Sequence, residues 1–425
     1  MMEVRTLSDK EKGKVNNRRN AHSAARKNAA VRSNPPTANN AGQNFTVIKG
    51  ERAKNRKNSF IRAIVSTIII LAVIITLLYL NTKSPGGIVE WSRIAWASMG
   101  SGEGYPVTES DRGIKSVYMQ GENVLTFTDT SLTIYNKNGK QIRNILHGYT
   151  TPAISVTKTR TLIYDRGANV FRVDNNYESL FEKKTDNPII TADMAENGTL
   201  AVITTATGYS AEMKIFNKNF IEKSSIYISG GDVTSVCVCK DGKHIVLSTV
   251  NASGGYYRTT VSKYDLSGDK PVSTATYDGT VILSIKQMDN GNFLLIGDNL
   301  CVVANDKLTE LNSISYEGEQ LSDFDVYGSQ AVLLLGSSML DYKVVGIAPD
   351  GKEQSRKSYD TEISAVLKQK NQTYVLKSEA IDCLDESGNV VESYECISGA
   401  SYLAGSGNGV ITVASVSSVS LVYAK

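Results

Sequence analysis

Candidate catalytic side chains are few in this sequence of 425 residues. It contains three histidines, and the two that lie beyond residue 50, His147 and His244, have no partner at a spacing typical of metal ligands. No set of nucleophile, histidine and carboxylate typical of a catalytic triad is recognisable either. The sequence therefore predicts no catalytic, metal-binding or cofactor-binding residue, and no cofactor.

Carboxylates provide the enzymatic alternative. Asp165, Asp193 and Asp298 fall near the ends of predicted strands, and two carboxylates held roughly 5–9 Å apart can hydrolyse a glycosidic bond. Solvated turn residues account for the same pattern. The segment DFDVYG, which starts at Asp323, has some likeness to a calcium loop but lacks a distal Glu and enough oxygen ligands, so we predict a turn there.

The five cysteines indicate packing rather than chemistry. Cys237 and Cys239 are two apart in one predicted strand, at irregular spacing from Cys301, Cys383 and Cys396. An odd number at such spacing is not typical of a disulfide framework, and free cysteine behaves as a small buried apolar residue. A bridge between Cys383 and Cys396 on neighbouring strands is the alternative.

Tyrosine is the residue type that best suggests recognition. The chain has 21 tyrosines against 9 phenylalanines, and Tyr256 and Tyr257 lie in GGYYRTT, an insertion in the repeated pattern described below. Tyr combines a large apolar ring with a hydroxyl, which suits a binding surface, although it also fills half-exposed strand positions. We predict Tyr256, Tyr257 and Arg258 as partner-binding residues.

An apolar segment, Phe60 to Leu80, precedes the residues considered so far. From Ala63 to Leu80 it carries no charge, and at about 1.5 Å per residue it just spans a bilayer core of roughly 30 Å. A cleaved signal peptide has a shorter apolar run and a small-residue cleavage site. We therefore predict an uncleaved transmembrane helix over residues 59–81, with a buried core helix as the alternative.

Charge predicts the orientation of this helix. Residues 1–58 carry fourteen Lys or Arg and four Asp or Glu, and Arg56, Lys57 and Arg62 flank the apolar run. Basic residues beside a membrane span are retained on the cytoplasmic side, so we expect a single-pass plasma-membrane protein with its amino terminus inside. With few large apolar residues, residues 1–58 are predicted to be a disordered cytoplasmic tail, and without interleaved aromatic residues they predict no nucleic-acid partner.

The segment after the span, residues 82–103, is predicted to be a juxtamembrane neck. It contains both tryptophans of the chain, Trp91 and Trp96, and its apolar residues follow helical spacing. Because Trp favours the membrane–water interface, we predict an interfacial helix. The alternative is that the two rings pack against the outer domain.

A repeat of roughly 41 residues runs through residues 104–425 and indicates the fold. Each unit contains one nearly unbroken apolar burst followed by an alternating strand and a polar turn. The bursts are NVLTFTD, TLIYDRG, TLAVITT, HIVLSTV, NFLLIGD, QAVLLLG, TYVLKS and GVITVAS. Repeats of this length with four short strands are typical of β-propeller blades, so we predict an all-β, eight-bladed propeller; seven blades, and more remotely a pair of sandwiches, are the alternatives.

The ends of the repeat predict a closed ring. The eighth unit stops after its third strand, and GYPVTES, residues 104–110, could supply the missing outer strand. A ring closed with strands from both ends leaves no long unpaired edge.

Several of these segments resemble a known family. GEGYPV, LIYDRGANVFRV, NGTLAVITTATGYSAEMKIFN and the run from KDGKHIVLSTV to YDL resemble an uncharacterised family of membrane-anchored propeller proteins of Gram-positive anaerobic bacteria, a domain of unknown function. The resemblance implies architecture and location, and no functional residue. The repeats are broadly similar to WD-type and quinoprotein blades, but the Trp-docking motif of the quinoproteins is missing, which argues against a quinone cofactor.

These observations favour a membrane-anchored, extracytoplasmic, non-enzymatic propeller that binds an envelope protein or a cell-wall polymer. A cell-envelope carbohydrate hydrolase or lyase, and a transmembrane sensor that signals through the basic tail, are the alternatives.

Overall fold

The structure is a computed structural model that describes residues 51–109, 113–337 and 340–424, with only the backbone for residues 51–59, 253 and 337. Its first helix, α1 (Glu51–Asn81), contains a segment of 22 residues, Phe60–Asn81, whose mean hydropathy of 2.8 is high enough to cross a membrane. The helix begins before the apolar run because Glu, Arg, Ala and Lys are good helix formers. The predicted tail up to residue 50, and the side chains of Arg56 and Lys57, lie outside the described residues.

A second helix, α2 (Gly87–Ala97), follows within the predicted neck. The connection to α1 is tight, because the backbone N–H of Ile88 donates to Asn81 Oδ1 at 3.1 Å. Gly87 has a φ of 75°, and a Cβ atom at this position would lie 2.4 Å from Asn81 Oδ1. This turn therefore requires glycine.

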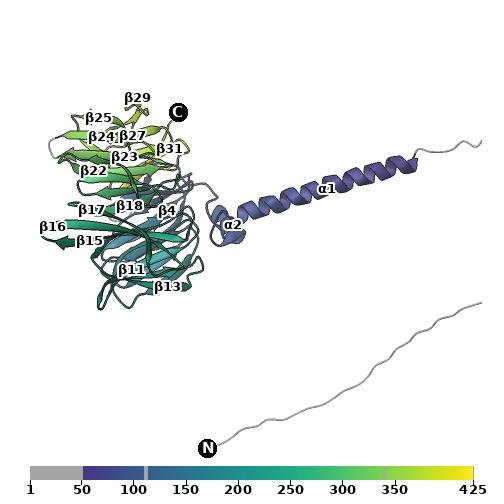
Figure 1. The fold of residues 1–425 in the computed structure, drawn as a ribbon. Coiled ribbons are helices and arrows are strands. Elements are labelled where there is room, and N and C mark those ends of the chain that lie inside the picture. The colour runs from purple at the N-terminus through teal and green to yellow at the C-terminus, as the bar shows by residue number, and fades with distance from the viewer. Residues whose placement is uncertain (1–50, 110–112, 338–339, 425) are drawn as a thin grey trace, which may run out of the picture. The chain divides into compact units, whose positions relative to one another are not determined.

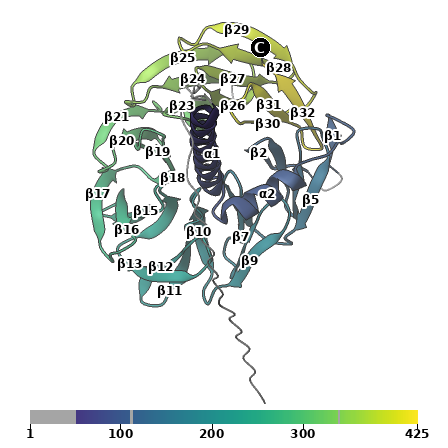
Figure 2. The same ribbon diagram turned by 90° about the vertical axis from the view of Figure 1, so that its right-hand side faces the viewer.

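The rest of the described chain forms eight four-stranded antiparallel sheets in a ring (Figures 1 and 2), which confirms the predicted eight-bladed propeller. Blade 1 contains β2 (Ser116–Gln120), β3 (Asn123–Phe127), β4 (Ser131–Tyr135) and β5 (Gln141–Leu146). Blade 2 contains β6 (Pro152–Val156), β7 (Thr161–Asp165), β8 (Val170–Asp174) and β9 (Ser179–Lys184). Blade 3 contains β10 (Ile189–Met194), β11 (Leu200–Ala206), β12 (Tyr209–Phe216) and β13 (Glu222–Ile228). Blade 4 contains β14 (Asp232–Val238), β15 (His244–Ser253), β16 (Tyr256–Asp265) and β17 (Pro271–Asp278).

The second half of the ring repeats this arrangement. Blade 5 contains β18 (Ile282–Gln287), β19 (Phe293–Gly297), β20 (Leu300–Ala304) and β21 (Glu310–Ser315). Blade 6 contains β22 (Gln320–Tyr327), β23 (Gln330–Ser337), β24 (Asp341–Ile347) and β25 (Glu353–Tyr359). Blade 7 contains β26 (Ile363–Gln369), β27 (Gln372–Lys377), β28 (Ala380–Leu384) and β29 (Val390–Glu395). Blade 8 contains β30 (Tyr402–Gly405), β31 (Val410–Ala414), β32 (Ser418–Tyr423) and β1 (Val107–Thr108).

Blade 8 closes the ring with strands from both ends of the domain, as the sequence predicts. β1 pairs with β32, Val107 opposite Val419 and Thr108 opposite Ser418. The next residue, Glu109, then reaches blade 1: its buried carboxylate accepts hydrogen bonds from Thr126 at 2.6 Å, Tyr135 at 3.2 Å and Thr133 at 3.3 Å. One short segment thus completes the last blade and binds the first.

The predicted apolar bursts form the second strand of each blade. β3, β7 and β19 are buried at every residue, because neighbouring blades cover both faces of the sheet. The same double burial explains why the sequence pattern of these strands is continuous rather than alternating.

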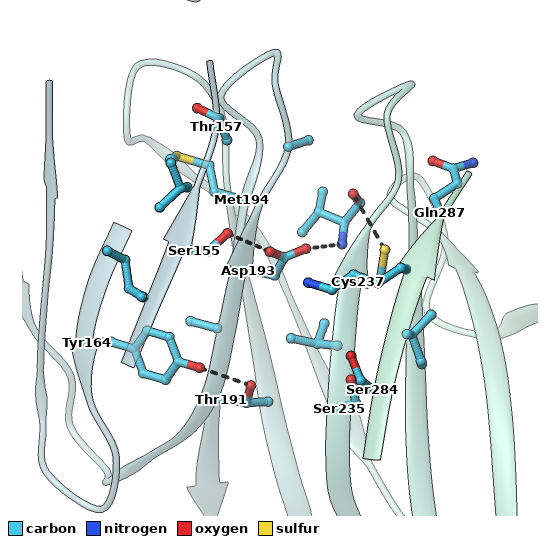
Figure 3. Close-up of a pocket in the computed structure, with 18 of the residues that line it drawn as sticks. Ser155, Thr157, Tyr164, Thr191, Asp193, Met194, Ser235, Cys237, Ser284 and Gln287 are labelled. Atoms are coloured by element: carbon cyan, nitrogen blue, oxygen red, sulfur yellow. Dashed lines mark hydrogen bonds between the residues drawn. The ribbon is translucent and has the colours of Figure 1, made fainter. Parts of the chain in front are cut away.

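The innermost strand of each blade has a free edge that faces the axis of the ring, and side chains of adjacent blades bind to that edge. The Val238 N–H donates to Asp193 Oδ2 at 2.8 Å (Figure 3), the Val366 N–H to Asp323 Oδ2 at 3.0 Å and the Lys368 N–H to Asp325 Oδ2 at 2.8 Å. These bonds satisfy backbone groups that an open sheet edge would leave unpaired.

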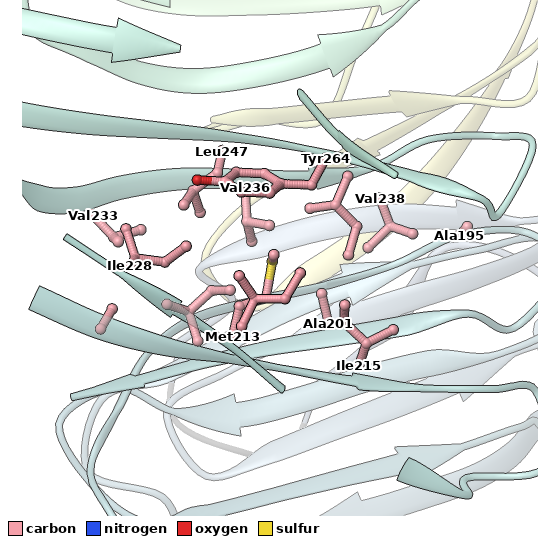
Figure 4. Packing of buried hydrophobic residues seen from close by; sticks show 14 residues of the cluster. Ala195, Ala201, Met213, Ile215, Ile228, Val233, Val236, Val238, Leu247 and Tyr264 are labelled. Carbon is pink, nitrogen blue, oxygen red and sulfur yellow. The ribbon is translucent and has the colours of Figure 1, made fainter. Parts of the chain in front are cut away.

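The apolar core lies between blades. Between blades 3 and 4, side chains of β11, β12 and β13 pack against those of β14 and β15, with Met213, Ile215, Val236 and Leu247 buried together (Figure 4). Burial of each such side chain contributes about 1.5–3 kcal/mol. Similar clusters join the other neighbouring blades, so each blade depends on the next for its stability.

Candidate functional site

The helix α2 is held on one face of the propeller by a buried ion pair. Arg160, in the turn between β6 and β7, donates to Glu90 from Nε at 2.9 Å and from Nη2 at 3.0 Å. Glu90 and Arg160 are 6% and 4% exposed. Burial alone would raise the pKa of Glu90, but hydrogen bonds from Arg160, Ser84 and the Gly86 backbone hold it below its ordinary value. The carboxylate is therefore charged at neutral pH.

Further contacts join the ion pair to blade 3, and the carboxyl end of α2 to blades 1 and 2. Arg160 Nη1 donates to the Lys218 carbonyl of blade 3 at 2.9 Å, and its guanidinium lies over the Phe220 ring. At the carboxyl end of α2, the Asn176 side-chain amide donates to the Ile94 carbonyl at 3.0 Å and Asn123 donates to Ser98 Oγ. Figure 2 shows α2 across blades 1 and 2. The turns that it contacts lie between first and second strands and between third and fourth strands, and we call this side the neck face.

The two predicted anchor tryptophans have different surroundings. Trp91 is half-buried and lines a cavity beside blade 1, whereas Trp96 is 77% exposed. Arg62, the remaining flank residue with a described side chain, lies exposed on α1. The docking of α2 on the propeller agrees with the packing alternative for the neck, and the exposure of Trp96 leaves this ring available for an interface.

The predicted binding residues lie on a hairpin that extends beyond its blade. β14 pairs with β15 only as far as Val250, and β17 pairs with β16 only as far as Arg258. Between these points, residues 251–257 form a two-stranded ribbon that extends beyond β14 and β17, and at its base the Gly279 N–H donates to the Tyr257 carbonyl at 2.8 Å. The ribbon belongs to a turn between second and third strands, so it projects from the face opposite the neck face, as Figure 1 shows for β15 and β16.

Two exposed aromatic rings dominate this ribbon. Tyr256 and Tyr257 are 75% and 60% exposed, and because they are consecutive in a strand, their rings lie on opposite faces. Arg258 is also exposed, but it is ion-paired. It donates to Asp278 of β17 from Nε at 2.6 Å and from Nη2 at 3.2 Å. The three residues, with Asp278 and Gly279, line a hollow of about 370 Å³.

A second cavity, of about 480 Å³, lies along the inner strands of blades 1 to 5 (Figure 3). Asp193 lies in its wall and accepts a hydrogen bond from Ser155 at 2.7 Å besides that from Val238. Burial raises the pKa of Asp193, while the ammonium group of Lys286 opposes this increase. The Asp193 carboxylate is thus used structurally, since it binds Ser155 and the Val238 backbone.

The sequence prediction of a turn at DFDVYG is wrong. These residues belong to β22, and Asp323 and Asp325 alternate with apolar residues along the strand so that both reach the inner edge of blade 7. Burial raises the pKa of Asp323 to about 6 and also raises that of Asp325. The period-two alternation of acidic and apolar residues was the signal for a strand.

A family model with the description "Family of unknown function (DUF5711)" matches residues 103–420, which is most of the chain. The chain belongs to the DUF5711 family. This confirms the resemblance to an uncharacterised propeller family, and the match begins just before β1, the strand that closes the ring.

The DUF5711 chain is similar in fold to solved propellers. BamB from Moraxella catarrhalis is 10% identical, with a TM-score of 0.51 over 75% of this chain and 99% of that one. The propeller domain of Cps50 (Swd1) from Myceliophteria thermophila is 8% identical, with a TM-score of 0.50 over 76% and 100%. No curated protein matches the sequence. Likeness at this identity shows the fold of the DUF5711 chain and nothing further.

The other carboxylates singled out in the DUF5711 sequence lie in separate blades. Asp165 accepts the backbone N–H groups of Thr150 and Thr151 at 3.0 and 2.7 Å, and Asp298 accepts that of Val281 at 2.9 Å. Together with the bonds of Asp193, these contacts show that each carboxylate binds backbone amides. The structure therefore places Asp165, Asp193 and Asp298 in three different blades and does not bring them together as a catalytic pair.

The histidines and cysteines of the DUF5711 chain also have structural roles. His147 packs between Phe127 and Tyr149, and His244 Nδ1 lies 2.6 Å from Asp241 in its own turn. All five cysteines are free, so the alternative bridge from Cys383 to Cys396 is wrong. No group of three or more His, Cys, Asp or Glu suited to a metal occurs among the described residues.

Proposed function

We propose that this protein is a single-pass, membrane-anchored scaffold that binds a partner protein of the cell envelope through the ribbon of residues 251–257. The observation that carries the proposal is the exposure of Tyr256 and Tyr257 on a ribbon that extends beyond its blade, opposite the neck face. Exposed aromatic rings supply contact area at low entropic cost. The parts of the ribbon edges that lie beyond β14 and β17 add backbone groups that an extended peptide can bind.

The anchoring part of the proposal rests on α1 and on charge. The segment Phe60–Asn81 is long and apolar enough to span a membrane, and residues 1–58 are strongly basic. By the positive-inside rule the amino terminus is cytoplasmic and the propeller extracytoplasmic. The protein is then non-enzymatic, with the propeller as a rigid support for binding loops.

Cysteine labelling tests the topology. A membrane-impermeant maleimide on intact cells is expected to label Lys184→Cys, an exposed position at the end of β9 on the face opposite the neck face, and to leave Ser33→Cys in the tail unlabelled until the cells are lysed. Labelling of Ser33→Cys alone would reverse the orientation. The five native cysteines are buried or half-buried, which keeps background labelling low.

Partner capture tests the ribbon. Chemical crosslinking in cells, followed by mass spectrometry, is expected to recover a recurrent envelope protein with the wild type and much less with Tyr256→Ala/Tyr257→Ala. Tyr423→Ala, which removes another exposed ring from blade 8, is the matched control and should capture normally. Recovery of cell-wall polymer instead of protein would show that the partner is a polymer. Equal capture by the wild type and the double variant would show that the ribbon is not the binding site.

A further inference from the structure

A third cavity, of about 600 Å³, lies between α2 and blade 1 on the neck face. One wall is apolar and comes from α2 and the residues that follow it, with Trp91, Ile94 and Met99. The opposite wall comes from the turns after β2 and β4 and from the turn between β6 and β7. The volume falls within the range of roughly 300–1,000 Å³ that small-molecule sites occupy.

Three lysines give this cavity a positive charge. Lys83, Lys137 and Lys158 line it, and Glu122 is the acidic residue of the lining. Glu122 pairs with Lys137 at 3.0 Å, with both side chains exposed. Lys83 contacts the Tyr79 ring, and the Glu196 carboxylate binds the backbone N–H of Lys158 from outside the lining. Among the described residues, the ammonium groups of Lys83 and Lys158 have no carboxylate partner, and such groups are suited to a phosphate.

The chain itself places this cavity near a membrane surface. The candidate span ends at Asn81, and Lys83 follows two residues later. Two residues extend at most about 7 Å, and the headgroup layer on each side of the hydrocarbon core is roughly 5–8 Å thick. Lys83 therefore lies at headgroup depth if α1 spans the bilayer. The ion pair of Glu90 with Arg160 fixes the propeller wall of the cavity to α2, which begins four residues after Lys83.

We propose that this cavity binds the headgroup phosphate of an anionic lipid. The lysine ammonium groups contact the phosphate, and Trp91, Ile94 and Met99 contact the glycerol and the first methylene groups. This inference rests on the anchoring part of the proposed function and is independent of the ribbon. It assigns the neck face to the bilayer, so that the propeller is held against the membrane by one bound lipid as well as by α1.

The test uses the full chain in nanodiscs of phosphatidylcholine alone or with about one third phosphatidylglycerol. Because the chain has only two tryptophans, Trp96→Phe leaves Trp91 as the single fluorescent reporter in the cavity wall. Phosphatidylglycerol is expected to shift the Trp91 emission, and native mass spectrometry is expected to show one retained anionic lipid. Glycerol phosphate added to phosphatidylcholine discs separates a soluble phosphate ester from a lipid, and a response to it alone would overturn the lipid assignment.

Charge variants decide whether the cavity is responsible. Lys83→Gln/Lys137→Gln/Lys158→Gln is expected to weaken retention of the anionic lipid at least about tenfold, given the attraction of each basic residue to anionic lipid. The control Lys270→Gln/Lys307→Gln/Lys352→Gln removes the same charge from other turns of the neck face, outside the cavity. Lys352 pairs with Asp350 at 3.0 Å as Lys137 does with Glu122. Equal retention by the two triple variants would overturn the proposal. Failure of the wild type to enter nanodiscs would instead contradict the anchor itself.

Discussion

The Glu90 carboxylate and the Arg160 guanidinium form a two-point ion pair across 70 residues of chain, at 2.9 and 3.0 Å, with both side chains buried. Glu90 belongs to the helix that follows the candidate membrane span, and Arg160 belongs to blade 2. A buried pair with this geometry makes the position of α2 on the propeller specific. It also makes the loss of either partner costly, because the other charge would remain buried alone.

Removal of Glu90 should therefore release α2. We expect Glu90→Ala to weaken the docking of α2 by about 3 kcal/mol or more, since Arg160 would be left without its carboxylate. Hydrogen exchange of residues 88–97 should accelerate while exchange of the blades stays the same. Arg93→Ala, which removes an exposed pair with Glu178 at 3.9 Å, is the control and should change little. Unaltered exchange in Glu90→Ala would contradict the role given to this pair.

Ring closure should depend on Glu109. Glu109→Ala leaves the hydroxyl groups of Thr126, Thr133 and Tyr135 without the carboxylate that accepts from them, at a cost of about 1–3 kcal/mol in the free energy of unfolding. Urea unfolding followed by circular dichroism measures this loss. Glu103→Ala, at an exposed position on the same segment, should unfold at the wild-type urea concentration. If both variants matched the wild type, closure would not rely on this network.

The stability of the propeller should depend on pH because Asp323 titrates. Burial raises the pKa of this carboxyl to about 6, whereas the unfolded value is about 3.9. Between these values the folded protein binds more protons than the unfolded chain, so the free energy of unfolding falls as pH rises from 4 towards 7. Asp323→Asn removes this titrating group, and the free energy of unfolding of the variant relative to wild type should rise by about 2 kcal/mol from pH 4 to pH 7.

Asp350→Asn provides the control for this titration. Hydrogen bonds from Lys352 lower the pKa of Asp350 rather than raising it. The free energy of unfolding of this variant relative to wild type should therefore not rise over the same pH range. A relative stability of Asp323→Asn that stayed constant from pH 4 to pH 7 would show that Asp323 titrates normally.

The propeller could be predicted from sequence because its signals are local. Each apolar burst, hairpin turn and outer strand lies within one repeat, and GYPVTES supplies the missing strand where the eighth unit ends, as β1 does. The exposed Tyr256 and Tyr257 were also predictable, because an insertion in a hairpin lengthens the hairpin. The partner class was not, since exposed rings do not specify what they bind.

Features that depend on distant contacts could not be predicted. Glu90 and Arg160 carry no pattern that connects them, because their pairing follows from where α2 meets the ring. Asp323 and Asp325 were assigned to a turn from residue type, although their alternation with Phe324 and Val326 fits a strand whose acidic residues satisfy the next blade. Residue type misled here because the inner edge of a propeller, unlike the edge of most sheets, is buried and requires acceptors.

Photocrosslinking from the ribbon tests the central claim most directly. A photoreactive amino acid at Tyr257 in the full-length protein, activated in living cells, should crosslink a single recurrent envelope protein, identified by mass spectrometry. The same amino acid at Tyr423, on blade 8, should not. Identical products from both positions, or only lipid and uncrosslinked protein from Tyr257, would contradict the account of the ribbon as a protein-binding surface.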